Sequence, residues 1–245
     1  MIKTTVDWKN PDFDSIIDVR SPLEYQDDHI FGAINCPVLD NEQRAKIGFL
    51  YTKVSGFQAK IEGAAMTSRN IASHIENKFL HFGGDWQPLI YCWRGGQRSR
   101  AMGLILSEVG WRVTLLDGGY KKYRYEVMQL IPKLSQQIKL VVVSGKTGSG
   151  KTNILREIAS IGGNILDLEA LAVHRGSLLG AVPNRSQPSQ KYFESKLLDT
   201  LEEFEAGSTV FVEAESSKIG DLHIPKGFWS EMCKAPCIQI KVPSE

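Results

Sequence analysis

Short apolar runs alternate with amphipathic stretches along the first half of the chain. Four runs have the apolar character of buried strands: SIIDVR (15–20), AINCPV (33–38), PLIYC (88–92) and RVTLL (112–116). Residues 99–109 lie between the last two runs, and their apolar positions share one helical face. Strands that alternate with helices predict a mostly parallel sheet with helices on both faces.

The pattern breaks around residues 132–137 and then starts again. The β-branched run KLVVVSG (139–145) is typical of a central parallel strand, and a helix is expected from Lys151 to about Ser160. Four further elements are expected: strands in NILDL (164–168), STVFVEAES (208–216) and PCIQIKV (236–242), and an amphipathic helix in 190–207 that ends at Gly207. We therefore predict two α/β domains, 1–135 and 136–245, with the second incomplete at its C-terminal end.

Composition is that of an ordinary globular protein of 245 residues. The chain is 42% hydrophobic, and 29 lysines and arginines against 28 acidic residues give a net charge of +1. This balance argues against disorder and against a protein that coats nucleic acid by charge alone, although a local basic groove is compatible with it. No apolar run is long enough for a membrane span, and the opening MIKTTVDWKN lacks a signal-peptide core. We expect a cytoplasmic protein without a membrane segment.

Residues 145–152 match the phosphate-loop pattern G-x-x-x-x-G-K-[ST] between a predicted strand and a predicted helix. The residues are Gly145, Lys146, Thr147, Gly148, Ser149, Gly150, Lys151 and Thr152. Glycines let backbone N–H groups turn toward a phosphate, and the helix N-terminus adds its positive dipole. Lys151 can reach the terminal phosphates and Thr152 can offer its hydroxyl to Mg²⁺. We predict a phosphate- or diphosphate-binding loop.

Acidic residues follow two of the predicted strands near this loop. Glu213 is the first choice for an acid that holds Mg²⁺ with Thr152, and Glu215 is the second; the alternative is a solvated strand end. Asp167 and Glu169 lie at the end of the preceding strand and could face the same crevice. No tightly bound cofactor is expected, and Mg²⁺ is the metal ion that these groups suit.

His174 and Arg175 follow directly after these acids. A cation at this place could hold a phosphate or a phosphorylated substrate. The alternative is the start of an ordinary surface helix.

Cys92 closes an apolar strand and opens the loop CWRGGQRS (92–99). A thiol held by loop N–H groups and facing a helix N-terminus, Arg94 and Arg98 should have a lowered pKa, which favours a nucleophile over an inert buried thiol. The spacing Cys92-x5-Arg98 also occurs in cysteine phosphatases, where a histidine usually stands at the position of Tyr91. Sulfur or selenium transfer and phosphate ester hydrolysis both stay open. Trp93 either stacks on a base or packs the loop.

The first half resembles a rhodanese domain. The resemblance rests on IIDVRSPLEYQDDHIFGAINCPV (16–38), the Cys92 loop and VTLLDGGY (113–120). Rhodaneses carry a sulfur atom on the loop cysteine as a persulfide, and their common loop places the arginine one residue closer than Arg98. The longer loop suits a larger anion.

The whole chain resembles the bacterial tRNA 2-selenouridine synthase family, in which a rhodanese domain is fused to a P-loop domain. Four blocks carry this resemblance: YCWRGGQRSRAMG (91–103), SGKTGSGKT (144–152), ILDLEALAVHRGSLLG (165–180) and FVEAESSKIG (211–220). Members of this family usually run on past the segment that matches 236–245 into a further helical region. The chain resembles a C-terminally shortened member.

The resemblance implies a transferase that replaces the sulfur of 2-thiouridine at the tRNA wobble position 34 by selenium from selenophosphate. The family also attaches a geranyl group from geranyl diphosphate, and the S-geranyl nucleotide is the intermediate. Lys151 would then stabilise the departing diphosphate. Cys92 would act in selenium transfer, and we infer that Arg94 and Arg98 hold the phosphate of selenophosphate. The implied partners are tRNA with 2-thiouridine at position 34 and selenophosphate synthetase.

Two other functions remain open from the residues. One is a rhodanese-type sulfurtransferase or cysteine phosphatase with a regulatory nucleotide-binding P-loop domain, and the other is a non-catalytic anion-binding module. A visible basic cluster is either a tRNA contact or a solvated helix face: Lys121, Lys122 and Arg124, with Arg100 and Arg112.

Overall fold

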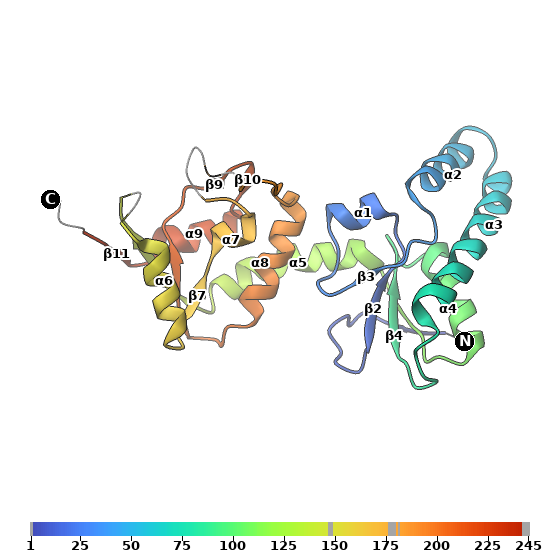
Figure 1. Cartoon of the computed structure of the whole chain (residues 1–245), viewed down its shortest axis with the longest axis horizontal. Helices are drawn as coiled ribbons and strands as arrows, with labels where there is room; N and C mark the ends of the chain where they lie inside the picture. The colour runs from blue at the N-terminus through green and yellow to red at the C-terminus, as the bar shows by residue number, and fades with distance from the viewer. Residues whose placement is uncertain (1, 147–148, 176–179, 181, 242–245) are drawn as a thin grey trace. The chain divides into compact units, whose positions relative to one another are not determined.

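The computed structural model describes residues 2–146, 149–175, 180 and 182–241. The chain forms two compact units, Met1–Tyr125 and Glu126–Glu245 (Figure 1). Helix α5 (Gly119–Ser135) contains the division between them.

A parallel sheet of five strands forms the centre of the first unit, in the order β1-β5-β4-β2-β3. The strands are β1 (Lys3–Thr5), β2 (Ser15–Asp18), β3 (Ile34–Asn35), β4 (Pro88–Tyr91) and β5 (Thr114–Leu116). β1 was not predicted, because Lys3–Thr5 has no apolar pattern. β3 is shorter than the predicted run, since Pro37 cannot donate to a strand ladder.

Helices cover both faces of this sheet. They are α1 (Pro22–Asp27), α2 (Asn41–Lys53), α3 (Gly56–His74), the π-helix η1 (Ile75–Phe79) and α4 (Gln97–Val109). The connection from β2 to β3 moves toward the β3 edge of the sheet. The connections from β3 to β4 and from β4 to β5 move in the opposite direction, toward the β1 edge. Right-handed crossovers therefore place α1 on one face and the contacting helices α3 and α4 on the opposite face (Figure 1).

The core of this unit is a cluster of buried apolar side chains around the central strands. Ile17 of β2 lies opposite Ile90 of β4, and Ile90 lies opposite Leu115 of β5. Met102 and Leu106 of α4 are fully buried in the same cluster. This packing anchors the carboxyl end of β4, from which the cysteine loop begins.

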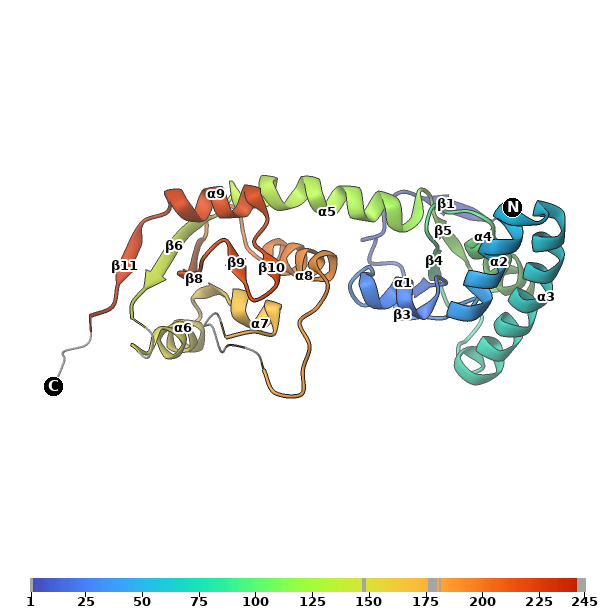
Figure 2. The ribbon, with the colours of Figure 1, turned by 90° about the horizontal axis from the view of Figure 1, so that it is seen from above.

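The second unit has a parallel sheet of four strands in the order β11-β6-β8-β7. The strands are β6 (Lys139–Ser144), β7 (Asn164–Leu166), β8 (Thr209–Glu213) and β11 (Cys237–Gln239), and a small hairpin joins β9 (Lys218–Ile219) to β10 (Leu222–His223). The helices are α6 (Lys151–Ser160), α7 (Leu168–Ala172), α8 (Gln190–Glu202) and α9 (Lys226–Lys234). Chain crossovers in opposite directions place α6 and α9 on opposite faces (Figure 2).

The predicted fold class, a rhodanese-like unit followed by a P-loop-like parallel-sheet unit, is confirmed. One predicted boundary is wrong, because α8 ends at Glu202 and not at Gly207. Glu202, Glu203 and Glu205 gather at this end, where negative charge opposes the helix dipole. Among the described residues, no helix is long and apolar enough to cross a membrane.

Candidate functional site

Cys92 lies at the carboxyl end of β4, and its loop packs against the first turn of α5. The backbone N–H of Tyr120 donates to the Cys92 carbonyl at 2.9 Å, and that of Lys121 donates to the Trp93 carbonyl at 3.0 Å. Gly119 has a φ of +53°, and a Cβ there would collide with the Cys92 carbonyl oxygen. Only glycine allows this close approach, so the turn and the loop support each other.

The Cys92 thiol is buried, with 3% of the residue exposed. Its Sγ accepts hydrogen bonds from the Gly96 N–H at 3.2 Å and from the Ser99 hydroxyl at 3.3 Å. Burial by itself would raise the pKa of Cys92, but hydrogen bonds from Ser99 and from the Arg94 backbone, with the charge of Arg98, outweigh it. The net pKa lies below the ordinary value, which favours the reactive thiolate.

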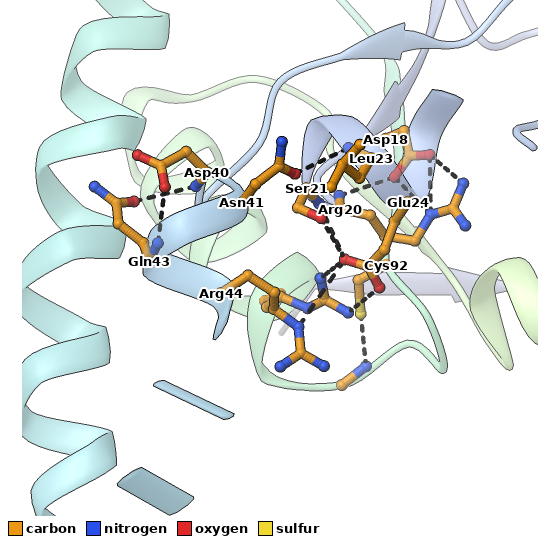
Figure 3. A network of polar contacts seen from close by, with 12 residues as sticks. Asp18, Arg20, Ser21, Leu23, Glu24, Asp40, Asn41, Gln43, Arg44 and Cys92 are labelled. Carbon is orange, nitrogen blue, oxygen red and sulfur yellow. Dashed lines mark hydrogen bonds and ion pairs between the residues drawn. The ribbon is translucent and has the colours of Figure 1, made fainter. Parts of the chain in front are cut away.

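Arg98 does not stand free beside the thiol. Its guanidinium forms a bidentate pair with Glu24 of α1, at 2.6 and 3.2 Å. The Ser21 N–H and hydroxyl donate to the same carboxylate at 3.1 Å each, and Arg44 Nε of α2 lies 4.0 Å away (Figure 3). Burial would raise the pKa of Glu24, but Arg98, Ser21 and Arg44 lower it. Glu24 is therefore a charged counter-ion at the cysteine loop.

Arg94 has an exposed side chain on the same loop. Arg94 and Arg98 were predicted from the sequence, whereas Ser99 as a partner of Cys92, and Glu24 and Arg44 near Arg98, were not. Glu24 had a local signal, because it stands three residues after Ser21 in a capping box at the start of α1. Arg44 had none, since its approach depends on how α2 packs.

A buried ion pair lies beneath this loop. Arg20 is 1% exposed, and its Nη2 donates to Asp18 Oδ2 and to the Asp28 carbonyl at 2.6 Å each. The guanidinium carbon lies 3.9 Å from the centre of the Tyr120 ring, and the Tyr120 hydroxyl donates to Asp28 at 2.8 Å. These contacts hold the turn against which the cysteine loop rests.

The second unit brings the P-loop lysine and threonine to one acid. Lys151 Nζ donates to the Gly145 carbonyl at 3.2 Å and lies 3.4 Å from Glu213 Oε1. The Thr152 hydroxyl donates to Glu213 Oε2 at 3.3 Å. Carboxylate and hydroxyl oxygens are ligands that Mg²⁺ prefers, so Thr152 and Glu213 fit that ion.

The rest of the predicted P-loop is described in part. Gly150 precedes α6 with a φ of +80°, a conformation that suits glycine. Ser149 and Gly150 are half-buried, whereas Lys146 is exposed. Thr147 and Gly148 lie outside the described residues.

Three glutamates meet beside the P-loop lysine. Glu169, Glu213 and Glu215 each place a carboxylate oxygen within 4.8 Å of the others. Burial, followed by the charge and hydrogen bond of Glu169, raises the pKa of Glu215 to about 7. Burial, followed by the charge of Glu213, also raises the pKa of Glu169. Near neutral pH this cluster can hold a proton or, after losing it, gain affinity for a cation.

The remaining predicted residues have other surroundings. The Asp167 carboxylate caps α7 by accepting from the Ala170 N–H at 2.8 Å. His174 is half-buried, and its backbone N–H donates to the Glu169 carbonyl at 3.0 Å. The Arg175 side chain is exposed. Glu169 is thus the acid that follows β7 and joins Glu213 and Glu215, whereas Asp167 has a structural contact.

Family models match both units. Residues 3–126 match the rhodanese-like domain, and residues 138–245 match the tRNA 2-selenouridine synthase AAA domain. The tRNA 2-selenouridine synthase of Nitrosomonas europaea is 36% identical over 233 residues, which are 93% of this chain and 60% of that protein. The tRNA 2-selenouridine synthase of Bdellovibrio bacteriovorus is also 36% identical, over 93% of this chain and 61% of its own length.

Among solved structures, a rhodanese-related protein from Thermoplasma volcanium is 20% identical, with a TM-score of 0.29 that supports no argument by itself. It covers 46% of this chain and 77% of its own. The chain spans about three fifths of the length of the curated relatives it matches. The two family models and the relatives nevertheless agree along nearly the whole sequence, and they show that the chain belongs to the tRNA 2-selenouridine synthase family, as a rhodanese-like domain followed by the AAA domain of that family.

Proposed function

We propose that the chain acts in the cytoplasm as a selenotransferase on tRNA that also transfers a prenyl group. It replaces the sulfur of 2-thiouridine at wobble position 34 by selenium from selenophosphate, through an S-geranyl intermediate made from geranyl diphosphate. The observation that carries this proposal is the joining of an activated cysteine loop to the AAA domain named for tRNA 2-selenouridine synthase. Curated relatives with this name span both units.

The second unit takes geranyl diphosphate in this proposal. The sulfur of 2-thiouridine attacks the first carbon of the geranyl group, the carbon–oxygen bond breaks, and diphosphate leaves. Lys151, backbone N–H groups of the phosphate loop and the N-terminus of α6 stabilise the negative charge that develops on it. Mg²⁺, when bound by Thr152 and Glu213, supplies further charge neutralisation.

The first unit takes selenophosphate. Selenium replaces the geranylated sulfur, which leaves as geranylthiol, and the donor phosphate is released by hydrolysis. Cys92 acts in this step as a thiolate. Arg94, which is exposed on the loop, is the first ligand of the donor phosphate. Arg98 is the second ligand, and its guanidinium binds the phosphate and Glu24 at the same time. Selenophosphate synthetase is the partner that would supply this donor.

Nucleoside mass spectrometry tests the proposal directly. The purified chain is incubated with tRNA containing 2-thiouridine, geranyl diphosphate, Mg²⁺ and selenophosphate, beside Cys92→Ala and Lys151→Ala variants. We expect selenouridine with the wild type alone, persistent geranylated nucleoside with Cys92→Ala, and neither product with Lys151→Ala. The longer relative from Nitrosomonas europaea is the positive control. If tRNA binds to the chain and stays unmodified while the relative turns over, the proposal is wrong for this chain.

A second candidate is sulfur transfer at Cys92 alone. The observation that favours it is the match of residues 3–126 to the rhodanese-like domain, because this match does not involve the second unit. Turnover of thiosulfate and cyanide that depends on Cys92 but not on Lys151, without tRNA modification, would support it. Cys92-dependent hydrolysis of p-nitrophenyl phosphate would instead support the cysteine phosphatase.

A further inference from the structure

Trp93 directly follows the buried Cys92 in the chain and is itself partly exposed at the surface. Trp93 is 38% exposed, whereas its neighbour Cys92 is 3% exposed. Its backbone carbonyl accepts from the Lys121 N–H at 3.0 Å, which ties this point of the loop to the start of α5. The exposed part of this tryptophan offers apolar surface that a flat ligand can cover with a gain in free energy.

The Trp93 ring packs against a buried aromatic side chain. The centres of the Trp93 and Tyr120 rings lie 5.2 Å apart, with an angle of 36° between their planes. Tyr120 is 2% exposed and is itself held by its hydrogen bond to Asp28 and by the Arg20 guanidinium. A ring with such support loses little conformational entropy when a flat ligand stacks on it.

Basic residues lie on the backbone segments next to Trp93. Arg94 and Lys121 are exposed on the two segments that meet at Trp93, and Arg98 follows four residues after Arg94. Aromatic rings that alternate with lysine and arginine are the combination that binds single-stranded RNA, because bases stack while the cations neutralise phosphates. The net charge of +1 for the whole chain does not reveal this local cluster of positive charge.

We propose that Trp93 is the stacking platform for the nucleobase that is modified at Cys92. The platform would hold an unpaired base flat beside the thiol, while Lys121 contacts the RNA backbone and Arg94 stays with the donor phosphate. This inference rests on the proposed function, since it takes the tRNA wobble base as the occupant. It adds a base-binding residue and a mode of recognition by π-stacking to that function.

Two substitutions of similar hydrophobicity isolate stacking from burial. Trp93→Phe keeps an aromatic face, whereas Trp93→Leu keeps an apolar side chain without one. Phe57→Ala is the control, because Phe57 is an exposed aromatic residue, 74% accessible, at the start of α3. The rate of Cys92 alkylation by iodoacetamide reports whether each variant keeps the loop intact.

The probe is an anticodon stem-loop RNA that carries S-geranyl-2-thiouridine at the wobble position. With selenophosphate present, we expect Trp93→Leu to raise KM for this RNA about tenfold, which corresponds to ~1.4 kcal/mol, with little change in kcat. Trp93→Phe should stay within about threefold of the wild type, in the range of base–aromatic stacking. Phe57→Ala should match the wild type.

If the wild type turns the RNA over and the leucine and phenylalanine variants have equal KM values, the stacking platform is overturned and the proposed function still stands. If no protein turns the RNA over, the proposed function fails for this chain. The equilibrium dissociation constant of the same RNA, measured without selenophosphate, then decides the inference. Tenfold weaker binding by Trp93→Leu alone supports it, and equal or absent binding contradicts it.

Discussion

Glu24 and Arg98 form a bidentate ion pair that joins α1 to the first turn of α4, with one contact of 2.6 Å and another of 3.2 Å. The pair is partly buried, with side-chain exposures of 22% and 17%. The positive charge of Arg98 helps to lower the pKa of Cys92. The negative charge of Glu24 partly neutralises Arg98 and so weakens this effect on the thiol. Glu24 thereby links a helix cap to the reactivity of a cysteine.

Replacing Glu24 by glutamine should make Cys92 more reactive. Glutamine removes the negative charge that neutralises Arg98, so the thiolate gains stabilisation from the arginine. We expect the alkylation rate with iodoacetamide at pH 7 to rise about two- to threefold, a modest effect because solvent screens the pair. Glu42→Gln, at an exposed position in α2, is the control. A slower reaction in Glu24→Gln would show that Glu24 mainly positions Arg98.

Ser99→Ala should have the opposite effect on the thiol. Burial raises the pKa of Cys92, and the Ser99 hydrogen bond, with Sγ and Oγ 3.3 Å apart, is the foremost contact that opposes it. Loss of a hydrogen bond of about 1 kcal/mol should slow alkylation at pH 7 about fivefold. The pH–rate profile should move to higher pH. Ser107→Ala, on the exposed side of α4, should leave the profile unchanged.

Gly119→Ala should disturb the cysteine loop more than an ordinary glycine substitution. Both Gly119 and Gly32 have positive φ values, +53° and +75°, so alanine strains the backbone at both. A Cβ at Gly119 would also strike the Cys92 carbonyl, while one at Gly32 would meet nothing within 4 Å. We expect Gly119→Ala to lower the free energy of unfolding by about 1–3 kcal/mol more than Gly32→Ala.

Thermal melting and the Cys92 alkylation rate check this pair. Equal melting temperatures and equal alkylation rates in the two alanine variants would mean that the first turn of α5 does not support the loop.

Glu215 should make stability depend on pH near neutrality. The folded state raises its pKa from 4.5 to about 7, so the folded state binds the proton more tightly than the unfolded state. Its contribution is fully present below pH 4.5 and is lost as the pH rises through 7. Glu215→Gln should flatten the fall in melting temperature between pH 5 and 8.

The control is Glu203→Gln, an exposed position after α8, which should keep the wild-type slope. A wild-type slope in Glu215→Gln as well would place the titrating group elsewhere.

Local patterns were sufficient to predict the elements that carry the two loops. The run at 88–92 predicted β4, and the helix expected at 151–160 is α6, because burial and phosphate-loop chemistry leave strong signals in contiguous residues. β1 left no such signal, since Lys3–Thr5 pairs at the sheet edge through backbone hydrogen bonds with little burial. The end of α8 was missed because charge at the helix terminus outweighed the glycine signal at Gly207.

The amino-acid sequence by itself determined the two α/β units, the cysteine after a buried strand and the phosphate loop after another. These features depend on neighbours in the chain. Tertiary structure alone decided the partners of these loops: Glu24 reaches Arg98 across 74 positions, and Glu213 reaches Thr152 across 61. The physical reason is that parallel strands collect their carboxyl ends at one edge, so side chains meet there according to strand order and helix packing.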